Sequence, residues 1–149
     1  LNATVSNPYF KNAQVVVMNK LSAPDYDAIE LLRTLTFAVE AGSAGEAELK
    51  AMDIMDYTAV QSQSSALMEV AAGTANACVI DITMANAMTG EGTGYPDLAI
   101  ACELSSEEYG IGFRKDSDMT AKVNEIMAEL MADGTLDALA EKYSLTLVK

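Results

Sequence analysis

Residues 39–49 read V-E-A-G-S-A-G-E-A-E-L, and they follow a short apolar run at residues 35–39. A short apolar run bounded by turn residues is typical of a buried strand. Ser43 stands three residues before Glu46, and this spacing is that of a capping box at the start of a helix. The stretch therefore predicts a strand, a tight turn and a helix over residues 43–52, which together form half of a β-α-β unit.

The two glycines of this stretch are not explained by capping alone. Glycine at Gly45, inside the first helical turn, costs roughly 1 kcal/mol relative to alanine. It leaves the start of the helix bare, with unpaired N–H groups at the positive end of the helix dipole. Such an end is suited to binding an anion. An anion site and a plain helix start both remain open on this stretch alone.

Strand-like and helix-like patterns alternate through the middle of the chain. Residues 14–18, 57–60 and 77–80 are predicted strands, and Gln63–Ala72 and Ile82–Met88 are predicted helices. This alternation predicts an α/β fold with a mostly parallel sheet flanked by helices. The other expected elements are helices at residues 25–32, 119–130 and 136–143 and strands at residues 98–102 and 109–113.

Asp81 directly follows the apolar run at residues 77–80, so its carboxylate is expected at the carboxyl end of a strand. Ligands of open α/β sheets bind at such ends. Because an unpaired buried carboxylate is costly, a cation is expected to meet it, although Asp81 could instead cap the following helix. A bare helix end and, one strand over, an aspartate match the carboxylate and the ammonium of a free α-amino acid.

The composition excludes several classes of function. The chain has 149 residues, with 22 Asp and Glu against 9 Lys and Arg and a net charge of −13, so no nucleic-acid partner is expected. It contains no histidine, which removes the usual general base and the commonest metal ligand. No cofactor is expected. Cys78 and Cys102 show no metal spacing and are interpreted as buried free thiols rather than a disulfide.

Five segments occur in an order that is familiar from one family. They are V-S-N-P-Y-F at residues 5–10, V-E-A-G-S-A-G-E at 39–46, A-C-V-I-D at 77–81, E-Y-G-I-G-F-R-K at 108–115, and the run at 123–143. They resemble segments of the amino-acid-binding extracellular solute-binding proteins (family 3) of ABC importers. The resemblance covers essentially the whole chain and implies the type II periplasmic-binding fold, in which two α/β lobes close over a ligand.

The resemblance implies seven ligand-binding residues, which are Glu40, Ser43, Ala44, Gly45, Asp81, Met84 and Tyr109. Ser43 and the backbone amides of Ala44 and Gly45 would receive the α-carboxylate of the ligand, and Asp81 would receive its α-ammonium.

The other three residues have less defined roles. By the resemblance, Met84 and Tyr109 lie near the pocket, and Glu40 faces the side chain of the ligand. The chain departs from the family pattern at Ala44, where Thr or Ser is frequent, at Asn76, where the family has Asp, and at Glu40, where Gln or an apolar residue is frequent.

The resemblance also implies a domain organisation. Residues 1–19 would form the hinge entry and a strand of lobe 1, residues 20–103 the complete lobe 2, and residues 104–149 the return strand and C-terminal helices of lobe 1. The N-terminal part of lobe 1 is absent from the sequence, so the chain is interpreted as N-terminally truncated. Exposed lobe 1 elements would then favour a homodimer.

The expected function is that of the substrate-binding component of an ABC amino-acid importer. It would bind a free polar or basic L-α-amino acid, deliver it to the permease subunits and catalyse nothing. The expected location is extracytoplasmic, in the periplasm or tethered to the outer face of the cell membrane. Two alternatives are the ligand-sensing domain of a receptor and a dehydratase-like enzyme on the same fold, for which Glu40 is the candidate acid or base.

Overall fold

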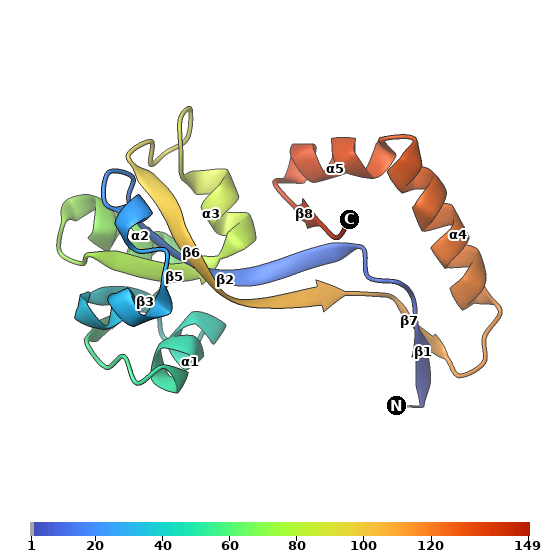
Figure 1. Ribbon diagram of the computed structural model, residues 1–149, viewed down its shortest axis with the longest axis horizontal. Helices are drawn as coiled ribbons and strands as arrows, with labels where there is room; N and C mark the ends of the chain where they lie inside the picture. The colour runs from blue at the N-terminus through green and yellow to red at the C-terminus, as the bar shows by residue number, and fades with distance from the viewer. Residues whose placement is uncertain (1) are drawn as a thin grey trace. The chain divides into compact units, whose positions relative to one another are not determined.

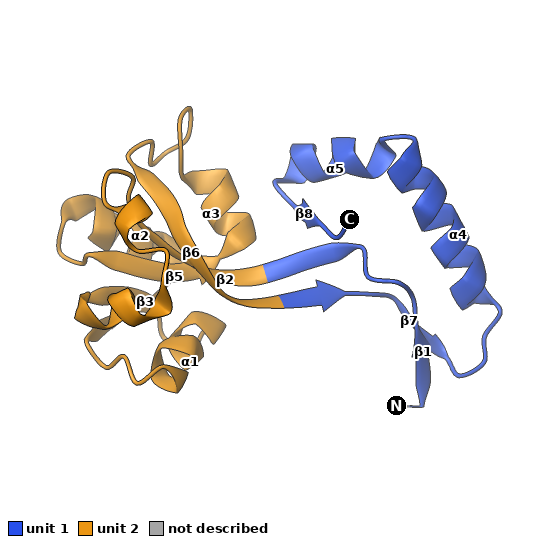
Figure 2. Ribbon diagram, viewed as in Figure 1, with its two compact units in different colours: residues 1–12, 107–149 blue, residues 13–106 orange. Residues whose placement is uncertain are grey.

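The chain forms two compact units in a computed structural model that describes residues 2–149 (Figures 1 and 2). Unit 1 comprises residues 2–12 and 107–149, and unit 2 comprises residues 13–106. The boundaries fall inside two long strands, β2 (Phe10–Asn19) and β6 (Leu98–Tyr109). Each of these strands changes from orange to blue at the boundary in Figure 2. Each unit is described by itself below.

Unit 2 is built on a sheet with the strand order β4-β3-β5-β2-β6. Strand β3 (Phe37–Glu40) runs parallel to β4 (Tyr57–Val60) on one side and to β5 (Ala77–Asp81) on the other. Strand β2 pairs antiparallel with β5. The prediction of an α/β fold with a mostly parallel sheet flanked by helices is confirmed, with β4, β3 and β5 as the parallel part.

Two core clusters cover the two faces of this sheet, because successive strand residues point to opposite faces. One face packs against α2 (Gln63–Ala72) and α3 (Ile82–Met88), and the other packs against α1 (Ala44–Ala51) and the segment before β3 (Figure 1). The first cluster includes Val15, Val17, Cys78, Ile80, Leu67 and Ala85, and the second includes Val16, Met18, Val79, Leu32 and Leu49. Burial on both faces explains why the run at residues 77–80 is apolar throughout.

The two cysteines are free thiols on opposite faces of the sheet. Cys78 is buried in the cluster beneath α2 and α3, whereas Cys102 packs, half-buried, against the other cluster. Burial raises the pKa of the Cys78 thiol to about 12, so this thiol is inert at neutral pH.

The helix predicted at residues 25–32 is wrong. Two short 3₁₀ helices, Ala23–Asp25 and Ile29–Thr34, occupy this region, and neither has a side-chain cap at its start. Pro24 stands in the first turn of the first one, and Ala28, which precedes the second, has no side-chain oxygen to offer. A segment this short without a cap does not sustain an α-helix.

Unit 1 contains two helices and short strands. Helices α4 (Met119–Ala132) and α5 (Thr135–Tyr143) occur where the apolar stripes predict them. Strand β1 (Ala3–Val5) pairs antiparallel with β7 (Gly112–Arg114), and β8 (Thr146–Leu147) pairs antiparallel with the first residues of β2. The sequence did not predict β1 and β8, because two or three residues are too few to show a period.

The strands predicted at residues 98–102 and 109–113 are replaced by one long strand, β6, followed by β7. The break falls at Gly110, where a side chain would have no room, since an added Cβ would lie 2.8 Å from Val5 Cγ1. Beside the break, Ser6 exchanges two hydrogen bonds with Ile111: its backbone N–H donates to the Ile111 carbonyl (2.9 Å) and its hydroxyl accepts from the Ile111 N–H (2.8 Å). A close backbone approach thus ends β6.

Helix α1 begins in close contact with the sheet. A Cβ added to Gly45 would lie 2.9 Å from Val79 Cγ1, 3.1 Å from the Val79 carbonyl oxygen and 3.2 Å from Val39 Cγ2. Gly45 is therefore required by the packing of α1 on β3 and β5. This packing role stands beside the predicted one of leaving the helix end bare.

We predict that Gly45→Ala lowers the free energy of unfolding by about 1–3 kcal/mol, because overpacking outweighs the gain in helix propensity. Gly94→Ala is the matched control, since an added Cβ there has only Met88 Cε, at 4.0 Å, as a neighbour. Urea unfolding of both variants measures the difference. A Gly45→Ala variant as stable as the wild type would contradict the close packing.

Candidate functional site

The carboxyl ends of β3, β4 and β5 meet at one edge of the sheet, because the three strands are parallel neighbours. Each of them leads into the start of a helix. Ser43 is the N-cap of α1, Ser62 that of α2 and Asp81 that of α3. This edge is where ligands of open α/β sheets bind.

The start of α1 offers unsatisfied hydrogen-bond donors. The Ser43 hydroxyl accepts from the backbone N–H of Glu46 at 3.2 Å, as the capping pattern predicts. Within residues 2–149, the N–H groups of Ala44 and Gly45 have no acceptor. Two free donors at the positive end of a helix dipole can receive a carboxylate.

Glu46 stabilises the turn before α1. Its Oε2 accepts from the backbone N–H of Gly42 at 2.7 Å, rather than from Ser43 as a capping box requires. Its Oε1 accepts from the Tyr57 hydroxyl at 3.0 Å and pairs with Lys50 at 2.9 Å. The Gly42 N–H, followed by Lys50 and Tyr57, lowers the pKa of Glu46 from its ordinary 4.5 to about 2. Glu46 therefore holds the turn as an anion.

Asp81 is held by two glutamines. Its Oδ1 accepts from Gln14 Nε2 and its Oδ2 accepts from Gln63 Nε2, both at 2.6 Å. Its backbone N–H donates to Gln63 Oε1 at 3.0 Å. Its side chain makes no capping bond to α3, so capping does not explain this carboxylate.

Sequence reasoning missed both glutamines. Gln14 lies directly opposite Asp81 in the β2–β5 register, and Gln63 is the first residue of α2. The contact of Gln14 with Asp81 can be predicted from the strand register. That register is known only once β2 is known to pair antiparallel with β5.

The remaining candidate residues lie in three different surroundings. Glu40 is half-buried at the end of β3, and its carboxylate has no hydrogen bond or ion pair within the described residues. Met84, in α3, packs against the core cluster. Tyr109 belongs to unit 1, where the centroid of its ring lies 5.3 Å from the centroid of the Phe10 ring. Whether these residues and the rest of the predicted set contact a ligand stays a prediction.

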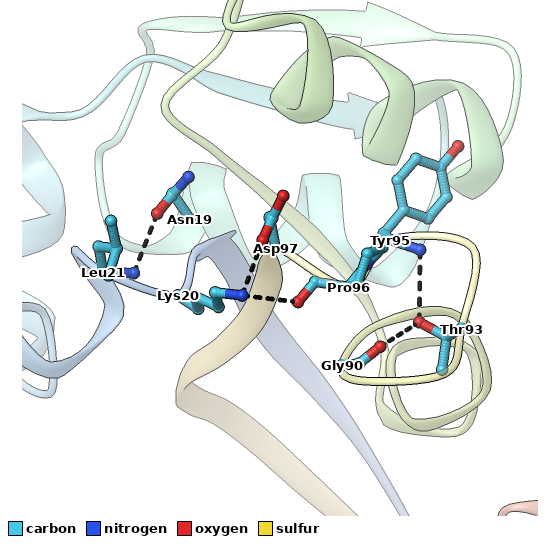
Figure 3. A network of polar contacts seen from close by, with 8 residues as sticks. All are labelled: Asn19, Lys20, Leu21, Gly90, Thr93, Tyr95, Pro96 and Asp97. Atoms are coloured by element: carbon cyan, nitrogen blue, oxygen red, sulfur yellow. Dashed lines mark hydrogen bonds and ion pairs between the residues drawn. The ribbon is translucent and has the colours of Figure 1, made fainter.

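Two shallow grooves of about 380 and 310 Å³ lie at the opposite edge of the sheet and share Asn19, Val70 and Ala71. The second runs beside the loop before β6, which is tied to the end of β2 (Figure 3). In this network Lys20 pairs with Asp97 at 2.7 Å. Both partners are exposed, so the pair contributes little to stability. Asp97, which lines the second groove, is thus already paired with Lys20.

Among the described residues no cluster of three His, Cys, Asp or Glu side chains could hold a metal ion. No helix within residues 2–149 is long and apolar enough to cross a membrane.

A family model of bacterial extracellular solute-binding proteins, family 3, matches residues 2–146. The chain belongs to this family. The resemblance on which the sequence interpretation rests is thereby confirmed, and the type II periplasmic-binding fold of the structural relatives agrees with the observed α/β architecture.

Three relatives of this chain carry further information. YxeM, a probable amino-acid-binding protein of Bacillus subtilis (strain 168), is 30% identical over 145 residues, which are 93% of this chain and 54% of that protein. The arginine-bound form of a truncated ArgBP from T. maritima is 35% identical with a TM-score of 0.58, over 86% of this chain and 60% of that one. An ancestral cationic amino-acid solute-binding protein is 24% identical with a TM-score of 0.76, over 95% of this chain and 62% of that one, and shows the fold alone. The chain thus spans little more than half the length of these relatives.

We predict that the stabilisation contributed by Glu46 depends on pH. Because its folded pKa lies below its unfolded value, the contribution is complete above pH 4.5 and is lost as the pH falls through about 2. The difference in urea midpoint between the wild type and Glu46→Gln should therefore shrink between pH 5 and pH 2.

Glu48→Gln, on the same helix, is the control and should change the midpoint little at any pH, since its carboxylate has no partner among the described residues. A Glu46→Gln difference that is the same at pH 7 and pH 2 would show that the carboxylate is not held as an anion.

Proposed function

We propose that the carboxyl edge of unit 2 binds the two charged groups of a free α-amino acid. One observation carries this proposal. The unsatisfied amides of Ala44 and Gly45 lie at the start of the helix that follows β3, and the oriented carboxylate of Asp81 lies at the end of the neighbouring strand β5. The amides and the Ser43 hydroxyl would receive the α-carboxylate, and Asp81 would receive the α-ammonium. The close approach of Gly45 to Val79, two residues before Asp81, supports a single site.

We propose further that unit 2 corresponds to the second lobe of a two-lobed receptor, predicted at residues 20–103. Unit 1 would supply hinge strands and C-terminal helices of the first lobe. Closure of the two lobes over the ligand would create the form that the permease subunits of an ABC importer recognise. The protein would act outside the cytoplasm without catalysing a reaction, which is supported by the description of the family as extracellular binding proteins.

The charge of unit 2 supports a cationic ligand. Residues 13–106 contain 13 Asp and Glu against 3 Lys and Arg, a net charge of −10 out of −13 for the chain. Such a surface attracts cations and speeds their association at low ionic strength. Glu40, whose carboxylate has no partner within residues 2–149, would face the ligand side chain and disfavour glutamate and aspartate. Arginine, lysine, ornithine and glutamine are the candidates, and the T. maritima relative is arginine-bound.

We predict that the full-length protein binds an amino acid from this group and that Asp81→Asn weakens the affinity at least tenfold. The substitution keeps the shape and removes the charge that meets the ammonium, and removing one partner of a buried charge pair typically costs about 2–5 kcal/mol. Calorimetry with the standard amino acids and ornithine measures it. Asp97→Asn, exposed at the opposite edge, is the control and should leave the affinity unchanged. Equal affinities for wild type and Asp81→Asn would refute the site.

We predict that Glu40→Gln lowers the preference for arginine or lysine over glutamine by about tenfold, because a lost charge contact is worth roughly 1–2 kcal/mol at a half-exposed site. Competition binding with the three amino acids gives the ratio. Glu48→Gln is the control, because it removes the same charge from unit 2 at a different place, on α1. If Glu40 contacts the ligand directly, Glu48→Gln should leave the preference unchanged. Tight binding of glutamate by the wild type would contradict the role of Glu40.

We also propose that the 149-residue chain, when expressed alone, associates with a second copy through unit 1. This unit exposes the large apolar side chains Met119, Ile126, Leu139 and Tyr143. An apolar groove of about 310 Å³ lies beside α5 and is lined by Phe10, Leu136, Leu139 and Leu145 among others. Exposed apolar patches favour association.

Light scattering of the isolated chain should therefore show a dimer or a larger assembly. Ile126→Glu, which places a charge on the exposed face of α4, should shift it toward the monomer. A stable wild-type monomer at high micromolar concentration would contradict this proposal.

A further inference from the structure

We propose that Gln14 and Gln63 are positioning residues that orient the Asp81 carboxylate for the ammonium of the ligand. This inference rests on the proposed function and deepens it. It assigns to two neutral side chains, one on a strand and one on a helix, the task of presenting a single charge.

Two structural elements approach the carboxylate, one for each oxygen. Gln14 projects from β2, directly opposite Asp81 in the strand register, and donates to Oδ1 at 2.6 Å. Gln14 is only 7% exposed, so its side-chain amide is shielded from water. Gln63 begins α2 and donates to Oδ2 at 2.6 Å.

Gln63 makes a second contact that fixes its own orientation. Its Oε1 accepts from the backbone N–H of Asp81 at 3.0 Å while its Nε2 donates to the side chain. The amide therefore bridges the backbone and the carboxylate of the same residue. A side chain held at both ends of its amide cannot rotate without losing both bonds, and this fixes the plane of the carboxylate.

The neutrality of the two donors is the reason for assigning them a positioning role. Each carboxylate oxygen can accept more than one hydrogen bond, so an amide donor on an oxygen does not by itself block an ammonium. Lysine or arginine at either position would compensate the charge and compete with the ligand. Glutamine orients the carboxylate without itself adding a positive charge, which suits a binding site for an ammonium.

A double-mutant cycle separates positioning from a general structural role. Gln14→Met and Gln63→Met keep the side-chain volume and remove the donors. Each should weaken the affinity of the full-length protein for the amino acid it binds best by about fivefold or more, since hydrogen bonds to charged groups are strong. In an Asp81→Asn background the same substitutions should change the affinity less than twofold, because the charge that they position is gone.

Gln61→Met is the matched control, because Gln61 is exposed two residues before Gln63 and makes no contact with Asp81. It should leave the affinity unchanged. Gln63→Met and Gln14→Met lie on different elements, so a folding failure of one leaves the other as the test. Equal loss of affinity with and without the Asp81 carboxylate would overturn the inference.

A measurement without ligand distinguishes this inference from the proposed function. In the NMR spectrum of the ligand-free protein, the side-chain amide signals of Gln14 and Gln63 should both shift in Asp81→Asn, and that of Gln61 should not. If the shifts are absent, the positioning inference fails even if the wild type binds amino acids. If the shifts are present and no amino acid binds, the glutamines do orient Asp81 and the proposed function fails.

Discussion

The contact between the first turn of α1 and strand β5 is the constraint on which the rest of the site depends. Gly45 lies so close to Val79 that only a residue without a side chain fits there. This contact brings the start of α1 beside the end of β5, so that the free amides of Ala44 and Gly45 and the carboxylate of Asp81 share one edge of the sheet. A bulkier residue would push the helix away from the sheet and separate the two groups.

The polar groups around this edge fall into two sets with different tasks. Glu46 is compensated locally by Gly42, Lys50 and Tyr57, and it stabilises the turn. Asp81 is contacted by the neutral amides of Gln14 and Gln63. Glu46 thus has a cation on its own helix among its partners, whereas the two amides that hold Asp81 add no positive charge of their own.

Much of the fold and part of this site could be predicted from the sequence. The alternation of strands and helices, the Ser43 cap and the position of Asp81 at a strand end follow from local periodicity and composition. Gln14 and Gln63 could not be predicted, because their contact with Asp81 depends on the register of an antiparallel pair and on the orientation of α2. The length of β6 was missed for a related reason, since a close approach of the chain at Gly110 determines where this strand ends. The helix expected before β3 was wrong because the segment is short and lacks a side-chain cap.

The most direct test of the account is a crystal structure of the full-length protein with L-arginine. The account predicts that the α-carboxylate of arginine lies within hydrogen-bond distance of the amides of Ala44 and Gly45, and that its α-ammonium contacts Asp81. The guanidinium group should lie on the side of Glu40. Arginine bound elsewhere, for example in the grooves beside Asn19 at the opposite edge, or bound with its α-ammonium away from Asp81, would contradict the account.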